Sequence, residues 1–190
     1  MKTQTAAALI LGILLFCAVP IGASPISLGI WYEFAYTGVG APATGCSPAD
    51  LLGPGCTPSS GGNSQFAAAP VWSITLGSPQ PLTVTDAFNR GDEFRVYDGP
   101  SLILTTPVVA NSGDCGTNPA VCLLDPLVSH ATIMVGAGLH EFSIVPVDSP
   151  YGGGAGYFSV GIPEGIPEPA TMLLAGLGLF ALGLARRRKK

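Results

Sequence analysis

Residues 26–37 alternate between two kinds of side chain over twelve positions. The even positions hold large apolar or aromatic residues, and the odd positions hold small or polar ones, with Trp31 as the one large exception. A period of two places successive side chains on opposite faces of a strand. The pattern therefore predicts a β-strand whose Trp31 lies on the face opposite the apolar one.

Seven later segments also have strand character, and Gly, Pro, Asn and Asp residues separate them. They are residues 71–76, 82–85, 93–97, 102–105, 131–135, 140–145 and 156–160. No helical period of 3.6 residues occurs between the two apolar ends of the chain. We predict an all-β, antiparallel β-sandwich, with a jelly-roll-like fold or a barrel as the alternative. The aromatic residues expected in its core are Trp72, Phe94, Phe142 and Phe158.

Four cysteines lie outside the N-terminal apolar segment, and this even number is typical of an oxidising compartment. Four cysteines allow three pairings. The pairs Cys46–Cys56 and Cys115–Cys122 are the simplest choice, because each brackets a short, turn-rich loop. The chain has no C-x-x-C motif, which disfavours a zinc site.

The N-terminal end has the features of a secretory signal peptide. Lys2 precedes an apolar stretch at residues 6–19, and the small residues Gly22 and Ala23 follow. We predict a signal peptide at residues 1–23, with cleavage between Ala23 and Ser24. The middle of the chain is therefore expected to be exported.

The other end carries an uncharged apolar run at residues 170–185, which as a helix would span about 24 Å. A membrane helix needs roughly 20 residues, so this one is short, but the flanking prolines and basic residues suit a membrane boundary. We predict a transmembrane helix with a cytoplasmic basic tail. That tail consists of Arg186, Arg187, Arg188, Lys189 and Lys190.

Pro167-Glu168-Pro169, the apolar run and the basic tail follow one another in this order. Together they resemble the PEP-CTERM sorting domain of Gram-negative bacteria, over about the last 25 residues. The resemblance implies that an exosortase, a membrane-embedded cysteine transpeptidase-like enzyme, recognises Pro167, Glu168 and Pro169. It also implies a link to exopolysaccharide or biofilm and to deposition at the cell surface or in the extracellular matrix. The expected domains are residues 1–23, 24–165 and 166–190.

The exported part is acidic. It contains eleven of the twelve acidic residues of the chain but only two basic ones, Arg90 and Arg95, so its net charge is −9. Such a domain repels nucleic acid, which we exclude as a partner. The same charge attracts divalent cations or maintains solubility.

The sequence contains no G-x-S-x-G, H-E-x-x-H or EF-hand pattern. Its densest acidic stretch holds four candidate calcium ligands: Asp86, Asp92, Glu93 and Asp98. Their spacing lacks the alternation of a calcium loop, and ordinary turn chemistry accounts for them as well. No metal or cofactor is therefore assigned. The Gly-rich residues 152–156 fit no phosphate-binding motif and are predicted to form a flexible hairpin connection.

These observations predict a noncatalytic surface or matrix protein. Its expected partners are signal peptidase, the general secretion machinery, an exosortase, the inner membrane before processing, and exopolysaccharide. The alternative is a small carbohydrate- or calcium-binding module. A groove with exposed Trp31, Tyr32 or Tyr36 would favour the carbohydrate alternative, because aromatic faces stack on sugar rings.

Overall fold

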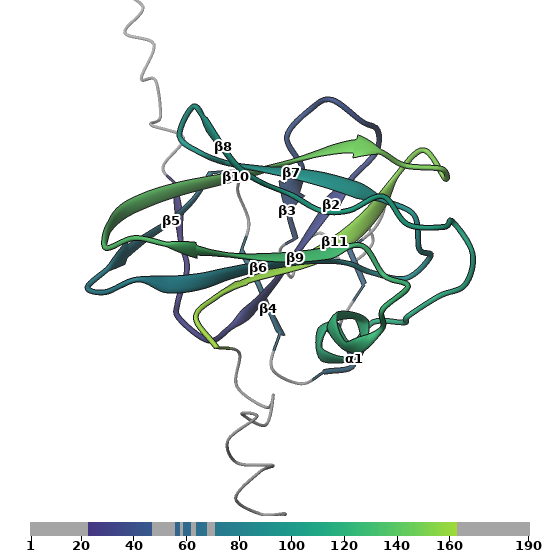
Figure 1. Cartoon of the computed structure of the whole chain (residues 1–190), viewed down its shortest axis with the longest axis horizontal. Helices are drawn as coiled ribbons and strands as arrows, with labels where there is room; N and C mark the ends of the chain where they lie inside the picture. Colours follow the sequence, from purple (N-terminus) through teal and green to yellow (C-terminus); the bar gives the residue numbers. More distant parts are fainter. Residues whose placement is uncertain (1–22, 47–55, 58, 62–63, 68–70, 163–190) are drawn as a thin grey trace, which may run out of the picture.

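The computed structural model describes residues 23–46, 56–57, 59–61, 64–67 and 71–162. Within these ranges the chain forms two stacked β-sheets and one short helix (Figure 1). Sheet A has the strand order β1 (Ser24–Pro25), β5 (Trp72–Leu76), β10 (Gly138–Asp148), β7 (Glu93–Asp98) and β8 (Ser101–Thr105). Sheet B has the order β3 (Thr44–Gly45), β2 (Trp31–Tyr36), β11 (Gly154–Val160), β6 (Gln80–Asp86) and β9 (His130–Val135), and β4 (Ser64–Phe66) also pairs with β2. The mostly β character that the alternation predicted is confirmed.

The strands depart from the prediction in two ways. Only residues 31–36 of the stretch 26–37 form a strand, β2, because a turn with Gly29 at φ 73° precedes it. The sheets are also not purely antiparallel, since β1 pairs with β5 and β4 pairs with β2 in parallel. These two strands have two and three residues, and long connections reach them, as parallel pairing requires.

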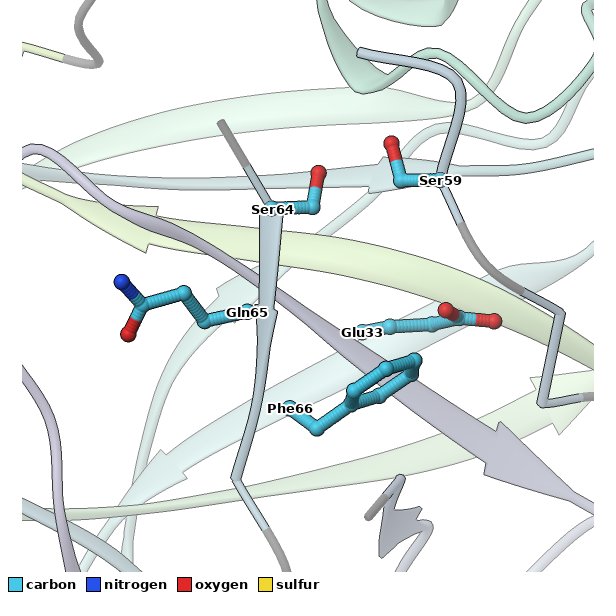
Figure 2. A pocket seen from close by; sticks show the side chains of 5 residues that line it. All are labelled: Glu33, Ser59, Ser64, Gln65 and Phe66. Atoms are coloured by element: carbon cyan, nitrogen blue, oxygen red, sulfur yellow. The ribbon is translucent and has the colours of Figure 1, made fainter. Parts of the chain in front are cut away.

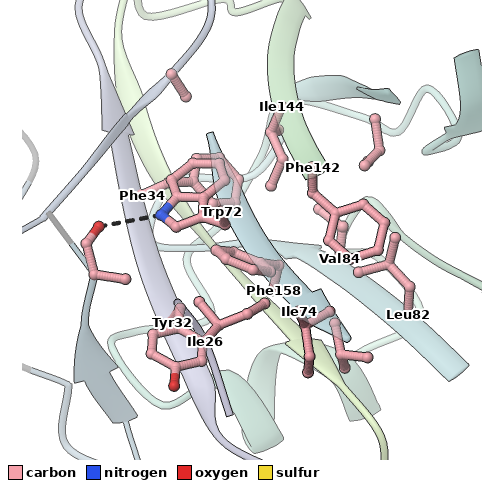
Figure 3. Close-up of a cluster of buried hydrophobic side chains, with 14 of the residues drawn as sticks. Ile26, Tyr32, Phe34, Trp72, Ile74, Leu82, Val84, Phe142, Ile144 and Phe158 are labelled. Carbon is pink, nitrogen blue, oxygen red and sulfur yellow. Dashed lines mark hydrogen bonds between the residues drawn. The ribbon is translucent and has the colours of Figure 1, made fainter. Parts of the chain in front are cut away.

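The main hydrophobic core lies between the two sheets (Figure 3). Trp72 of sheet A and Phe158 of sheet B have ring centroids 4.7 Å apart, and Phe34 meets Phe94 edge to face at 5.1 Å. The indole N–H of Trp72 donates to the carbonyl oxygen of Ala67 at 3.1 Å, so its one polar atom is satisfied. All four aromatic residues predicted for the core are fully buried.

Strands β2 and β11 of sheet B are buried on both faces. The side chains that alternate away from the main core pack instead against Cys46, Cys56, Phe88 and Leu123 of the helix. On β2 and β11 these outward residues are Trp31, Glu33, Ala35, Ala155, Tyr157 and Ser159, and each is at most 2% exposed. We call this surface the outer face of sheet B.

The cover of the outer face includes α1 (Pro119–Leu124), which the sequence pattern did not predict. Six residues are too few to show helical periodicity, but the local signals are present. Asn118 caps the helix by accepting the N–H of Ala120 at 3.0 Å, and a proline follows at the first helical position. The bridge Cys115–Cys122 ties the helix to the segment before it.

Both predicted disulfides, Cys46–Cys56 and Cys115–Cys122, are present in the structure. Cys46 and Cys56 pack with Ala35 on the outer face of sheet B, so this bridge also anchors the cover.

The Gly-rich connection after β10 is not a hairpin, because β10 belongs to sheet A and β11 to sheet B. It carries the chain from one layer to the other. Glycine is required inside β11 for a packing reason: a Cβ on Gly156 would lie 2.4 Å from Cζ of Phe34. Gly156 therefore leaves room for the ring of Phe34, which lies on the neighbouring strand β2 of the same sheet.

The predicted signal peptide, except Ala23, and the predicted membrane helix lie outside the described residues. In the part of the chain that is described, no helix has the length and apolar character needed to cross a membrane.

Candidate functional site

A small pocket lies against the outer face of sheet B (Figure 2). Its volume is about 110 Å³, and its lining residues are Glu33, Ser59, Ser64, Gln65 and Phe66. The strand β2 contributes Glu33, whereas the parallel strand β4 contributes three of the other residues. In the register of this pair, Ser64 lies beside Trp31 and Phe66 lies beside Glu33.

Glu33 is the ionisable group of this pocket. It is 1% exposed, and its Oε1 accepts the backbone N–H of Thr57 at 3.0 Å. Burial raises the pKa of Glu33 to about 7, although the N–H of Thr57 opposes the change. The carboxyl group is therefore present in both protonation states near neutral pH.

Tyr157 lies opposite Glu33 across the β2–β11 pair. Its hydroxyl donates to the carbonyl oxygen of Thr117 at 3.0 Å. Burial, and then the nearby charge of Glu33, raise the pKa of Tyr157 above its ordinary value. Tyr157 therefore remains a neutral hydrogen-bond donor that links sheet B to the segment before α1.

Two polar atoms of the pocket lack hydrogen-bond partners among the described residues. They are Oε2 of Glu33 and Oγ of Ser64, and both are fully buried. On the same face of sheet B, the indole nitrogen of Trp31 and Oγ of Ser159 are likewise buried without a partner in that part of the chain. Buried polar atoms in native proteins are nearly always hydrogen-bonded, so this face carries unused hydrogen-bonding capacity.

Sequence reasoning did not single out Glu33, Ser59 or Ser64. A signal for Glu33 is visible in retrospect, because a carboxylate interrupts the otherwise apolar and aromatic stretch of β2. No comparable signal marks Ser64, whose position depends on a parallel pairing between β2 and a three-residue strand.

The calcium candidates do not form one cluster. Asp86 and Asp92 lie together inside the fold, whereas Asp98 lies at the far end of β7. There Asp98 is 2.7 Å from Nδ1 of His140 and also accepts the backbone N–H of Glu141 at 3.0 Å. Glu93 begins β7 and is half-buried. Within the described ranges, no group of three or more His, Cys, Asp or Glu side chains is placed to hold a metal ion.

Asp86 organises the turn between β6 and β7. Its carboxylate accepts the backbone N–H groups of Ala87 at 2.8 Å, Gly91 at 3.1 Å and Asp92 at 3.2 Å. Burial, followed by the charge of Asp92, raises the pKa of Asp86 to about 8, and the three N–H groups oppose this change. Both carboxylate oxygens of Asp86 are thus used in hydrogen bonds of the turn, as the turn chemistry considered for this stretch predicts.

Asp92 accepts the hydroxyl group of Tyr36 in a buried contact. Burial raises the pKa of Asp92, and this hydroxyl opposes the change. Glycine at position 154 leaves room for the pair, since a Cβ there would lie 2.6 Å from Oδ2 of Asp92. Asp92 is thus packed into the end of the main core, where one of its oxygens is committed to Tyr36.

The three aromatic residues whose exposure would favour carbohydrate binding form no exposed groove. Trp31 is 0% exposed, Tyr32 4% and Tyr36 5%, so none of the three offers a face to a sugar ring. Trp31 does lie on the face opposite the main core, as predicted, but α1 and its neighbours cover that face. The exposure that would favour carbohydrate binding through Trp31 is therefore not found.

The residues expected to direct export and sorting are only partly described. Ser24 begins β1 and donates its backbone N–H to Val71 at 2.8 Å, so cleavage after Ala23 would leave β1 within the mature chain. Outside the described residues lie the predicted recognition residues Pro167, Glu168 and Pro169, and the basic residues Arg186, Arg187, Arg188, Lys189 and Lys190.

Among the comparisons with known proteins, the match to a family model covers the C-terminal segment and not the β domain. No curated protein matches the sequence. The crystal structure at 1.0 Å of the pre-peptidase C-terminal domain of a collagenase from Bacillus anthracis aligns with 74% of this chain and 96% of that one. The alignment has 12% identity and a TM-score of 0.37, and we base no argument on it. Residues 165–189 match the family of the PEP-CTERM protein-sorting motif, as the tail residues predicted. The chain therefore carries a PEP-CTERM sorting motif.

Proposed function

We propose that the chain is an exported protein that an exosortase recognises at Pro167-Glu168-Pro169, and that its β domain then acts at the cell surface or in the matrix. The observation that carries this proposal is the match of residues 165–189 to the sorting motif. The two disulfides of the β domain support export, because such bridges form and persist in oxidising compartments.

The sequence offers a closely matched control for the sorting experiment. Pro167-Glu168-Pro169 is preceded by a second Pro-Glu pair at Pro163 and Glu164, which lies upstream of the matched residues 165–189. We expect replacement of 167–169 by alanine to abolish the processed form and its release at the surface in the host. Alanine at 163 and 164 should leave both unchanged. If the 167–169 variant has the mature mass and surface level of the wild type, exosortase recognition at this tripeptide is wrong.

The β domain is proposed to act by binding and display, without catalysis. The chain lacks the common catalytic patterns, and the carboxyl groups with raised pKa values are divided between two places. Asp86 holds a turn and Asp92 holds Tyr36 inside the fold, whereas Glu33 is the one carboxyl group among the described residues of the pocket lining. Hydrolysis of a glycan, ester or peptide by the purified protein, lost in Glu33→Gln, would contradict this part of the proposal.

A further inference from the structure

The pocket on the outer face of sheet B has the properties of a built polar site. Glu33 is 1% exposed and reaches the pocket with Oε1 held by the N–H of Thr57 and Oε2 without a partner among the described residues. Ser64 adds a second buried oxygen of the same kind. Figure 2 shows both side chains at the pocket together with the ring of Phe66.

The rest of the lining is held in place by the protein itself. Oγ of Ser59 donates to the carbonyl oxygen of Thr117 at 2.8 Å and accepts the N–H of Gly61 at 3.0 Å. Phe66 packs against the Cys46–Cys56 cluster. A ligand would therefore meet positioned groups and would not have to order the lining, which lowers the entropic cost of binding.

The charges around the pocket limit the chemistry of its occupant. Among the described residues, its lining contains one carboxyl group and no cation. Arg90, one of the two arginines of the β domain, is paired with Asp125, and Arg95 lies on β7 of sheet A. An anionic ligand would thus face Glu33 without compensation. Hydroxyl groups fit the site well, because each can donate to a carboxylate oxygen and accept from a serine.

The size of the pocket limits how much of a ligand can enter. A cavity of about 150 Å³ accommodates a benzene molecule. A volume of about 110 Å³ is therefore suited to one edge of a sugar ring and not to a whole disaccharide. Gln65 also belongs to the lining, but it lies between Ser64 and Phe66 on β4 and its side chain points away from theirs (Figure 2).

We propose that this pocket binds the hydroxyl-bearing edge of one sugar unit of a neutral polysaccharide. Oε2 of Glu33 and Oγ of Ser64 would hydrogen-bond to adjacent hydroxyl groups, and the ring of Phe66 would contact the C–H face. The inference rests on the proposed display function in one respect, because display at the surface or in the matrix is what would bring the pocket to a polysaccharide. It does not require exosortase processing.

The test uses the full chain, purified in a detergent without sugar groups, so that a failure of sorting in the host cannot affect it. The probes are neutral gluco-, manno- and galacto-oligosaccharides, with uronic acid and glucosamine oligomers as charged counterparts. We expect a neutral oligosaccharide to bind with a dissociation constant on the order of 1 mM, as suits a few hydrogen bonds. Ser64→Ala should weaken this binding about fivefold, which corresponds to one hydrogen bond.

Ser101→Ala, an exposed serine on β8 of sheet A, is the matched control and should bind like the wild type. A second measurement follows the backbone amide signals of Phe66 and Gln80 by NMR during titration. The signal of Phe66 should shift, whereas that of Gln80, which does not line the pocket, should not. Equal affinity of Ser64→Ala and the wild type, tighter binding of the charged oligomers, or binding of no sugar would each overturn the proposal.

Discussion

At the scale of the residue, Glu33 is the side chain with the largest consequence for the outer face of sheet B. A single carboxyl group, 1% exposed, lies in a strand whose other five residues are apolar or aromatic. Burial of a charged carboxylate destabilises the fold. One backbone hydrogen bond reduces this cost, and protonation of Glu33 removes the charge. The protonation makes the stability of the fold sensitive to pH.

The first prediction concerns this sensitivity. The folded-state pKa of Glu33 is raised to about 7 from an ordinary value of 4.5. Below pH 4.5 the group is protonated in both states and imposes no charge on the fold. As the pH rises from 4.5 through 7, the unfolded chain releases this proton more readily, so the free energy of unfolding falls. Each pKa unit corresponds to about 1.4 kcal/mol, so the loss should be on the order of 3–4 kcal/mol.

Urea unfolding of the wild type and Glu33→Gln at pH 4.5, 6 and 8 measures this contribution. The difference between the two proteins isolates Glu33 from Asp86, whose pKa is also raised. The variant should gain stability relative to the wild type as the pH rises. Glu141→Gln, at an exposed position of β10, is the control and should show no such gain. If the free energies of unfolding of the wild type and Glu33→Gln differ by the same amount at all three pH values, Glu33 is solvated and the prediction is wrong.

At the scale of the element, the cover over sheet B is made of short pieces that disulfides hold together. The helix α1 has six residues, and β3 and β4 have two and three. None of these would be stable by itself, since short helices and strands depend on tertiary contacts. Cys122 lies within α1, and Cys46 and Cys56 pack on the outer face of the sheet.

We predict that loss of either bridge lowers the free energy of unfolding by about 2–3 kcal/mol, because each closes a short loop in the unfolded chain. The double variants Cys46→Ala/Cys56→Ala and Cys115→Ala/Cys122→Ala should each show this loss in urea unfolding. Full reduction of the wild type with dithiothreitol is the matched control and should approach the sum of the two. Mass mapping of a nonreduced digest checks the pairing, and a peptide that joins Cys46 to Cys115 would contradict it.

At the scale of the whole molecule, the charge of the exported part determines how it can be retained by a polymer. Its net charge is −9, and one of its two arginines is already paired with Asp125. Direct ion pairing with an anionic polysaccharide is therefore unfavourable. The buried position of Trp31 also removes the stacking surface that the sequence had suggested.

We predict that the mature protein is retained on an anionic host exopolysaccharide only when a divalent cation is present, whereas retention on a neutral polymer does not require the cation. Pull-downs with and without a chelator, on both kinds of polymer, measure this difference. Ser64→Ala should reduce retention on the neutral polymer, and Ser101→Ala should not. Retention on the anionic polymer that survives the chelator would mean that a cationic surface is involved.

The sequence by itself determined the properties that depend on neighbouring residues. Eight strands could be located because a period of two is a local property of the backbone, and the aromatic core residues followed from it. The two disulfides were predictable because each joins cysteines close in sequence. The sorting motif was recognisable because its three parts follow one another along the chain.

Only the tertiary structure decided which of these surfaces contacts water. Alternation places Trp31 and Glu33 on the face opposite Phe34, but it does not say whether another segment covers that face. The cover comes from α1 and the two bridged segments, and its pieces are too short to leave a periodic signal. The pocket at Glu33 depends on a parallel pairing of β2 with residues more than thirty positions away. Contacts of this kind depend on how the layers and the cover pack, and no local pattern records that packing.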